Sequence, residues 1–175
     1  MEKKPQKSAS LLVDLRGLYR MQAECFLKDW KRLLPLSEMV VDRWEKAKRL
    51  GFGKHVSIYD SSIVFGDVKV GHHTWIGPFT ILDGSGGLKI GSYCSISAGV
   101  QIYSHDSVQW AVSGGRAPYE KKKTIIGNNC YIGPNCIIVK GVVLGNRIIV
   151  GANSFVNKSF PTGSKIAGNP AVLLK

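Results

Sequence analysis

The sequence predicts an all-β solenoid, a parallel β-helix, with a helical segment before it. Three features of the chain carry this prediction. Aliphatic residues recur at every sixth position over most of residues 56–158, glycine often follows them directly, and a small or β-branched residue stands four positions later. Residues 8–50 differ, because their apolar residues recur at spacings of three, four and seven, as on one side of a helix.

Residues 1–55 are expected to form a helical extension. The apolar stripe begins at Leu11, Pro35 interrupts it, Ser37 is a candidate N-cap of a second helix, and Gly51 supplies a stop. Lysines and arginines occupy the other helical faces. Two hypotheses fit this pattern: the helices cover one end of the main domain, or the basic helices make a weak contact with a membrane surface.

Residues 56–175 are expected to form the solenoid domain. The spacing of six runs from Ile58 to Leu82, an eight-residue step leads to Ile90, and the spacing of six returns from Ile126 to Val156. Each unit forms one short parallel strand and a tight turn, and three units close a triangular coil whose aliphatic residues fill the interior. Residues after about 158 are expected to form a C-terminal tail.

The composition of the chain limits the kinds of molecule that the protein is expected to bind. A net charge of +12 suits phosphorylated ligands, anionic glycans or an anionic membrane face. Nucleic acid is not expected, because the aromatic residues do not interleave with the basic ones as a stacking platform requires. No apolar run approaches the length of about 20 residues that a membrane span needs, and Asp14 and Arg16 interrupt the only candidate signal peptide. A cytoplasmic location is therefore expected.

The four cysteines fit the repeat better than they fit a metal site. Cys94, Cys130 and Cys136 occupy the inward small-residue position, and Cys25 lies in the helical segment. Their spacing matches no recognised ligand pattern, so we expect buried, reduced cysteines and no metal. Catalytic zinc usually needs three protein ligands, and the adjacent His72 and His73 are expected to be corner residues instead.

Two interruptions of the repeat point to a functional site. "DGSGG" begins at Asp83, and a longer insertion, expected to project as a loop, occupies about residues 103–123. Leu82 and Ile102 are three units apart, so both insertions should leave the same corner of successive coils, with Asp83 close to Tyr103 and His105. Insertions in solenoids commonly build binding sites. His105 falls outside the packed interior and is the leading candidate for a reactive residue.

A second column follows from the same count. Ile96, Ile132 and Val150 should share another side, which aligns a set of small corner residues along one edge. Two hypotheses stay open. In the first, the column forms a groove in which an extended ligand bonds to exposed backbone groups, and in the second, the small residues serve only to make tight corners. The aligned residues are Ala98, Gly133, Pro134, Gly151 and Ala152.

The repeats, the segment "SISAGVQIYSHD" and the C-terminal stretch from "TIIGNNCYIGPNC" to "GNPA" resemble the hexapeptide-repeat acyltransferases over residues 56–175. The resemblance is to the sugar O-acetyltransferase branch, which includes galactoside, maltose and surface-polysaccharide acetyltransferases. It implies a left-handed β-helix and a homotrimer with active sites between subunits. It also implies acetyl-CoA as the donor and His105 as the general base of a direct ternary-complex transfer to a carbohydrate acceptor.

The resemblance also implies roles for other residues. Asp83 and Tyr103 are the candidate acceptor-binding residues. Val172 departs from the family, in which that position is often basic, so no single lysine is assigned to the 3′-phosphate of coenzyme A. The first 55 residues do not resemble the galactoside or maltose enzymes, which favours a surface-polysaccharide or lipid-linked acceptor. The expected cofactor-binding residues are Tyr131, Gly133, Pro134, Gly151, Ala152, Lys158 and Lys175.

Two alternatives remain open from the sequence. One is an N-acetyltransferase that acts on an amino sugar or another amine, since an amine that arrives deprotonated needs less help from a base. The other is a non-catalytic β-helix that scaffolds an assembly, although such a protein would need neither the projecting loop nor the polar residues at its root.

Overall fold

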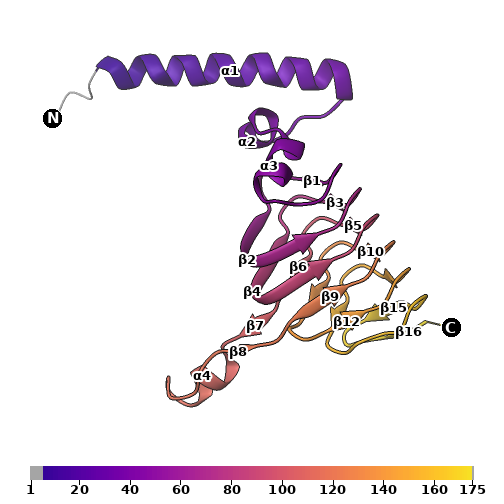
Figure 1. Cartoon of the computed structure of the whole chain (residues 1–175). Helices are drawn as coiled ribbons and strands as arrows, with labels where there is room; N and C mark the ends of the chain where they lie inside the picture. The colour runs from indigo at the N-terminus through magenta and orange to yellow at the C-terminus, as the bar shows by residue number, and fades with distance from the viewer. Residues whose placement is uncertain (1–5, 175) are drawn as a thin grey trace. The chain divides into compact units, whose positions relative to one another are not determined.

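The structure, a computed structural model, describes residues 6–174 (Figure 1). The chain divides after Asp42 into two compact units, a short helical unit and a unit that contains the coils. The expected boundary lay after residue 55, so the division falls earlier than the sequence indicated. The reason is that a third helix belongs to the coils.

The N-terminal unit contains α1 (Gln6–Trp30) and α2 (Leu36–Val40). Ala23 and Met39 are buried, whereas Leu11 and Val13 are 60% and 67% exposed. Ser37 does not cap α2, because the helix begins at Leu36 with Pro35 in the N-cap position and without a side-chain cap. The expectation of a Ser37 cap was therefore wrong. Among residues 6–174, no helix is long and apolar enough to cross a membrane.

Helix α3 (Arg43–Arg49) closes the first coil. Ala47 is 2% exposed and belongs to the core of the coils. Lys46 donates hydrogen bonds from Nζ to the backbone carbonyls of Tyr59, Asp60 and Ser62, at 3.0, 2.7 and 3.1 Å. These bonds satisfy carbonyls that have no further coil to pair with, so α3 covers the end of the solenoid.

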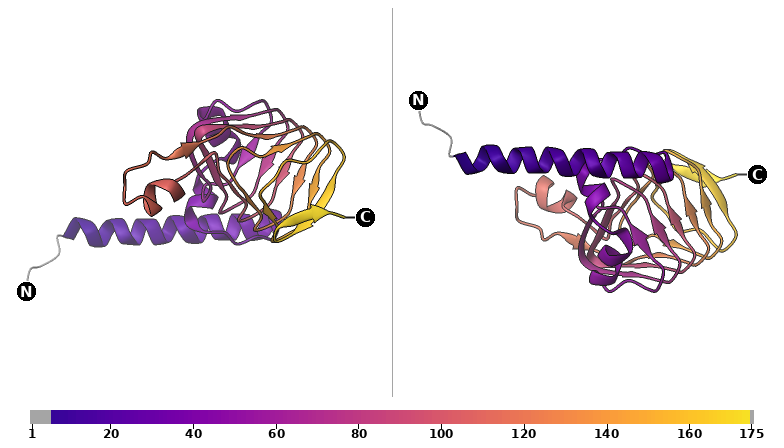
Figure 2. Two further views of the ribbon diagram at one scale, coloured as in Figure 1. Left: turned by 90° about the horizontal axis from the view of Figure 1, so that it is seen from below. Right: turned by 90° about the horizontal axis from the view of Figure 1, so that it is seen from above.

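The coils form a left-handed parallel β-helix with three faces (Figure 2). Face one contains β1 (Ser57–Ile58), β3 (Trp75–Ile76), β5 (Ser95–Ile96), β10 (Tyr131–Ile132), β13 (Ile149–Val150) and β15 (Lys165–Gly168). Face two contains the first halves of β2 (Ile63–Val70) and β4 (Ile81–Ile90), then β6 (Gln101–Ile102), β11 (Ile137–Ile138) and β14 (Phe155–Val156). Face three contains the second halves of β2 and β4, then β9 (Thr124–Ile126) and β12 (Val143–Leu144).

The registers confirm the six-residue count. Leu82 pairs with Ile102, and Ile132 pairs with both Ile96 and Val150. The second residue of each short strand points inward, and these five aliphatic residues of the count are fully buried. A column of interlocking aliphatic side chains therefore forms the core, and its burial is the main stabilising contribution of each coil.

The C-terminal part continues the coils further than expected. Ile166 of β15 pairs with Val150 and is fully buried, and Phe160 bridges to Leu144. β16 (Ala171–Leu173) then folds back antiparallel on β15 and covers its free edge. The segment expected as a tail from residue 158 is thus part of the solenoid up to residue 173.

The buried cysteines take the positions that the repeat assigns to them. Cys94, Cys130 and Cys136 are buried, free of disulfides, and donate from sulfur to backbone carbonyls. Burial raises the pKa of the Cys136 thiol, so this side chain stays protonated and packs as a small apolar residue. Cys25 lies on α1 and is exposed.

Candidate active site

The long insertion forms a two-stranded ribbon that projects from the coils (Figures 1 and 2). Its strands are β7 (His105–Asp106) and β8 (Glu120–Lys121), and the short helix α4 (Val108–Val112) lies between them. The ribbon is antiparallel, with His105 opposite Lys121 and Asp106 opposite Glu120. Directly opposite residues of an antiparallel pair extend their side chains to the same face, so each face of the ribbon carries one of these pairs.

Asp83 and His105 meet at the root of the ribbon, as the sequence count predicted. The Asp83 carboxylate accepts hydrogen bonds from the backbone N–H groups of Ser85, Ser104 and His105, at 2.7, 3.1 and 3.2 Å. It also contacts Nδ1 of the His105 ring. Ser104 is itself buried and accepts a hydrogen bond from Gly86 at 2.8 Å, which ties the two insertions together.

The surroundings of Asp83 fix the state of the His105 ring. Burial opposes ionisation of Asp83, but the hydrogen bonds from Ser85, His105 and Ser104 outweigh it, so the pKa of this carboxyl lies below its usual range. An ionised carboxylate only accepts hydrogen bonds, so Nδ1 of His105 carries a proton and donates it. In the neutral form of the ring, the lone pair is then on the other nitrogen, Nε2.

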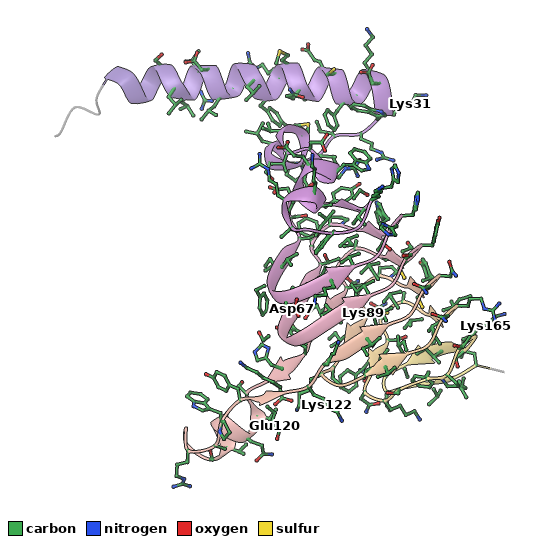
Figure 3. The ribbon with its side chains drawn as sticks, viewed as in Figure 1. Lys31, Asp67, Lys89, Glu120, Lys122 and Lys165 are labelled. Carbon is green, nitrogen blue, oxygen red and sulfur yellow. The ribbon has the colours of Figure 1, made fainter. Side chains whose placement is uncertain are left out.

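The opposite face of the ribbon is bound to the coil below. Lys140 contacts the Asp106 carboxylate and forms an ion pair with Glu120 at 2.8 Å. Its hydrogen bond lowers the pKa of Asp106, and the two carboxylates together raise the pKa of Lys140. Figure 3 labels Glu120 at this root. The clamp holds β7 in place, and with it the backbone of His105.

A cavity of about 320 Å³ opens beside His105. Tyr103 lines it, and the Tyr103 hydroxyl donates a hydrogen bond to Gln101 at 2.7 Å. Burial, and then the negative charge of Asp83, raise the pKa of Tyr103, so its hydroxyl stays protonated. The remaining lining residues are Asp106, Ser107, Val108, Val139 and Lys140.

Aromatic rings flank His105 on its open side. The ring centroids of Phe65 and Tyr119 lie 6.4 and 6.5 Å from that of His105. Trp110 of α4 packs edge-on against Tyr119, with a centroid separation of 5.5 Å. The imidazole therefore lies between the ionised carboxylate of Asp83 and the partly exposed aromatic rings of Phe65 and Tyr119.

The structure differs from the sequence expectation in the surroundings of Asp83. Its side chain has no exposed surface, and its oxygens already accept four contacts from the protein. An acceptor could not reach it directly, so the direct acceptor contact expected of Asp83 does not fit this burial. Tyr103 lines the cavity beside His105, and its contact with an acceptor stays a prediction.

The column of small residues is also present, but at another corner. The Asn135 N–H donates to the carbonyl of Ala98 at 3.0 Å, and the Asn153 N–H donates to the carbonyl of Pro134 at 2.9 Å. We call residues 97–100, 133–136 and 151–154 the small-residue corner. A Cβ at Gly133 would lie 2.6 Å from the backbone nitrogen of Ala152, so the coils approach too closely there for any other residue.

Within one chain, the expected cofactor residues and His105 do not meet. The small-residue corner precedes the face-two strands, whereas His105 and Lys140 follow them, at what we call the loop corner (residues 65–68, 83–87, 103–123, 139–142 and 157–159). Tyr131 points outward on face one, next to the small-residue corner. Lys158 belongs to the loop corner, where its Nζ lies 5.6 Å from the ring centroid of Phe160. Lys175 lies outside the described residues.

Several residues of the site were not identified from the sequence. Lys140, Phe65 and Ser104 all follow face-two strands, so the six-residue count already placed them at the loop corner. The six-residue count did not indicate that these three residues belong to the site, because each is of a type that is common at the corners of the coils. Glu120 and Tyr119 come from the return strand of the ribbon, whose pairing no repeat specifies.

The other histidines make structural contacts at the third corner. Nδ1 of His72 accepts a hydrogen bond from the Lys54 N–H at 2.8 Å. The rings of His55, His73 and Tyr93 stack at 4.7 and 4.8 Å, the spacing of successive coils. Within residues 6–174, no three His, Cys, Asp or Glu side chains form a group that could hold a metal ion.

Comparison with known proteins identifies the repeat. The family described as bacterial transferase hexapeptide (six repeats) matches residues 123–158, and this segment contains six consecutive strands, β9 to β14. Residues 123–158 of this chain are hexapeptide repeats. The family match and the three-faced coils agree on the same unit, one strand and one turn in every six residues.

Two known proteins are similar to this chain, one in sequence and one in structure. Protein CapG from Staphylococcus aureus is 44% identical over 92 residues, which span 50% of this chain and 52% of CapG. The chain thus matches about half the length of that relative. A hexapeptide-repeat acetyltransferase from Vibrio cholerae, VCA0836, has a structure with acetyl-CoA that superposes with a TM-score of 0.68 at 25% identity, over 91% of this chain and 87% of that one.

A third protein has the same fold at lower identity. AntD, an N-acyltransferase from Bacillus cereus in complex with dTDP and 3-hydroxybutyryl-CoA, superposes with a TM-score of 0.64 at 24% identity. The superposition covers 77% of this chain and 90% of AntD. AntD is evidence for the fold alone.

Proposed function

We propose that this hexapeptide-repeat protein is a cytoplasmic O-acetyltransferase. In this proposal it moves an acetyl group from acetyl-CoA to a sugar hydroxyl in surface-polysaccharide or lipopolysaccharide biosynthesis. The observation that carries the proposal is the pairing of His105 with the buried, ionised Asp83 at the root of a projecting loop. The free thiols of Cys94, Cys130 and Cys136 fit a reducing compartment.

His105 is the general base of the proposed reaction. Its Nε2 accepts the proton of the acceptor hydroxyl as the acceptor oxygen attacks the thioester carbonyl carbon. When the carbon–sulfur bond breaks, His105 returns that proton to the leaving sulfur, so the ring is restored and the products are an acetyl ester and a free thiol. Asp83 orients the ring and stabilises the positive charge that it carries between the two steps.

The need for a base favours a hydroxyl over an amine. A sugar hydroxyl is a weak nucleophile at neutral pH, whereas an amine that arrives deprotonated attacks without a base. A buried carboxylate that holds one histidine tautomer is the arrangement that base catalysis requires. The rings of Phe65 and Tyr119 supply the apolar surface on which the CH groups of a sugar ring can rest.

The donor fits the small-residue corner. Pro134 is half-buried and Ala152 is exposed, and neither projects a side chain that would obstruct an extended pantetheine arm along the column. Lys165 is an exposed cation near the C-terminal end of the coils, where the phosphates of acetyl-CoA require positive charge. Lys158 is also exposed, but it lies at the loop corner and would have to come from a neighbouring subunit. VCA0836, which is 25% identical to this chain, binds acetyl-CoA on the same fold.

A homotrimer would bring the two halves of the site together. His105 and the small-residue corner lie on opposite sides of face two, so they can act on one pair of substrates only if they come from different subunits. The outward residues of that face include Ile63 and Ile137, which are 56% and 37% exposed. An apolar face between two half-sites suits contact between copies.

The direct test is the variant His105→Ala, compared with the wild-type protein by coenzyme A release in the presence of sugar acceptors. We expect turnover to fall at least ~100-fold. The oligomer, measured by light scattering, and the affinity for acetyl-CoA should be unchanged. Retained turnover would remove His105 from the mechanism.

The same assay separates the proposal from its two rivals. An amino sugar acetylated at nitrogen faster than any hydroxylated sugar, with turnover that survives His105→Ala, would indicate an N-acetyltransferase. A scaffold without catalysis predicts no rise in melting temperature with acetyl-CoA. Binding at 100 times Kd stabilises a protein by about 2.7 kcal/mol, which a thermal-shift assay detects easily.

A further inference from the structure

The ribbon carries different charges on its two faces. Asp106 and Glu120 share one face, and both bind Lys140 on the coil below. His105 and Lys121 share the other face, because they are also directly opposite. Their Cβ atoms are therefore about 5 Å apart. The extended Lys121 side chain reaches several ångströms beyond its Cβ, so its ammonium group lies on the same face of the ribbon as His105.

The coil above confirms the side on which Lys121 lies. A Cβ at Gly86 would lie 3.2 Å from the Cβ of Lys121, and one at Gly87 would lie 3.6 Å from the Cγ of Lys123. Both lysines therefore lean toward the insertion that contains Asp83. Lys122 leans the other way, because a Cβ at Gly141 would collide with its Cδ. Side chains alternate in this way along an extended chain.

The acidic groups near this site are already paired. Asp83 is buried under His105, while Asp106 and Glu120 bind Lys140. Asp67, at the same corner one coil above Asp83, lies 3.8 Å from Lys69. Of the ion pairs formed within residues 6–174, none includes Lys121 or Lys123, and both side chains are exposed.

We propose that the acceptor carries a phosphate group close to the hydroxyl that is acetylated, and that Lys121, assisted by Lys123, binds this phosphate. The inference rests on the proposed acetyl transfer at His105 and specifies its substrate class, a phosphorylated or nucleoside-diphosphate-linked sugar. Lys121 is a specificity-determining residue for that reaction.

A phosphate fits these groups better than a neutral sugar does. Lysine is a compact, strongly hydrated point charge that binds phosphate oxygens, and two unpaired lysines on one face match a group with two negative charges. A neutral acceptor would leave both ammonium groups without a partner beside the reacting hydroxyl. Lys89, which Figure 3 labels on face three, is exposed and adds positive charge near the same corner.

The test compares Lys121→Gln with Lys122→Gln, which removes the same charge one residue away on the opposite face. Initial rates are measured with hexose 1-phosphates, UDP-hexoses, hexuronic acids and free hexoses. For the phosphorylated acceptor that is used best, we expect Lys121→Gln to raise KM at least ~10-fold and to leave kcat within about twofold. Lys122→Gln should leave both constants within about twofold, and neither variant should change KM for acetyl-CoA.

Salt gives a second readout. The KM of the wild-type protein for the phosphorylated acceptor should rise between 0.05 and 0.5 M KCl, because salt screens the attraction between lysine and phosphate. This rise should be smaller in Lys121→Gln than in Lys122→Gln, because Lys121→Gln has already lost the contact that salt would screen. Preference for a hexose 1-phosphate over a UDP-hexose, or the reverse, identifies the source of the phosphate. Either preference supports the proposal.

Three outcomes overturn it. Free hexoses or hexuronic acids used as well as their phosphorylated forms would exclude a phosphate requirement, although acetyl transfer would stand. If Lys121→Gln and Lys122→Gln raised the KM for the phosphorylated acceptor equally, the effect would come from the overall positive charge of the region and not from a binding site on one face of the ribbon. A rise in KM for acetyl-CoA with Lys121→Gln would assign the lysine to the donor. Turnover of no sugar at all would instead contradict the proposed function itself.

Discussion

The small-residue corner and the loop corner are built on the same strands but are stabilised differently. At the small-residue corner, backbone groups of successive coils bond to one another, as Asn135 does to Ala98. At the loop corner, side chains replace part of that ladder. Asp83 accepts the N–H groups of Ser104 and His105, and the Thr124 hydroxyl donates to the carbonyl of Tyr103 at 2.7 Å.

This difference indicates which part of a solenoid can form a catalytic site. In the regular coils, backbone groups bond to the next coil, as Asn135 and Asn153 do. When the repeat is interrupted, the backbone groups freed from the ladder need partners, because an unpaired buried N–H or C=O is costly. The polar side chains that satisfy them are the ones that orient His105. Stability should therefore depend on the regular coils, and catalysis on the interrupted corner.

The largest expected effect tests the regular coils. Ile132 is fully buried and stacks between Ile96 and Val150, so Ile132→Ala should lower the free energy of unfolding by about 2–5 kcal/mol. Ile125→Ala removes the same atoms from a half-buried outward position on face three and should cost less than half as much. Chemical denaturation of both variants measures this difference, and equal losses would contradict the assignment of the core.

The next largest effect tests the loop corner. Asp83→Asn keeps the size of the side chain but removes the charge that holds the His105 ring, so kcat should fall ~100-fold, about 2.7 kcal/mol of transition-state stabilisation. Asp67→Asn changes a more exposed carboxyl one coil above and should leave kcat within about twofold. If the two variants had equal activity, the pairing of Asp83 with His105 would have no catalytic role.

Most of the fold was predictable from the sequence, because a repeat states the same information many times. The spacing of six residues placed Ile96, Ile132 and Val150 on one face and brought Asp83 to His105 across a separation of 22 residues. Each assignment needed only counting, since every coil buries one aliphatic residue per face. The hand of the helix did not follow from the spacing and came from the resemblance.

The remaining features depend on interactions that occur once. The return strand β8 pairs Glu120 with Asp106 through a loop whose length no repeat determines. Lys140 occupies an ordinary corner position, and its role as a clamp appears only when both carboxylates are in place. The burial of Asp83 also escaped prediction, because it results from two insertions that close over one another. Helix α3 joined the coils through Ala47 and Lys46, contacts that helical spacing alone does not reveal.

A smaller effect is expected from the clamp. Lys140→Met leaves Asp106 and Glu120 facing each other without their cation, which should loosen β7 and lower kcat ~10-fold. Lys140→Arg retains the charge and should recover most of the activity. Hydrogen exchange over residues 103–123 should increase in Lys140→Met only. A fall in kcat without faster exchange would exclude a positioning role.

The smallest effect concerns acid stability and the same clamp. The hydrogen bond from Lys140 holds the pKa of Asp106 below its ordinary value of 3.8, so the unfolded chain binds the proton more readily than the folded one. The contribution of Asp106 to stability is therefore complete above about pH 4 and is lost as the pH falls through the lower, folded-state pKa.

Asp106→Asn removes that contribution at every pH. Because the pair is partly exposed, the wild-type protein should melt at most about 3 °C above the variant at pH 7, and this difference should shrink below about pH 4. In a Lys140→Met background the same substitution should change the melting temperature less, since its partner is gone. A difference that persisted unchanged to pH 3 would show that Asp106 stabilises the ribbon through packing rather than through its charge.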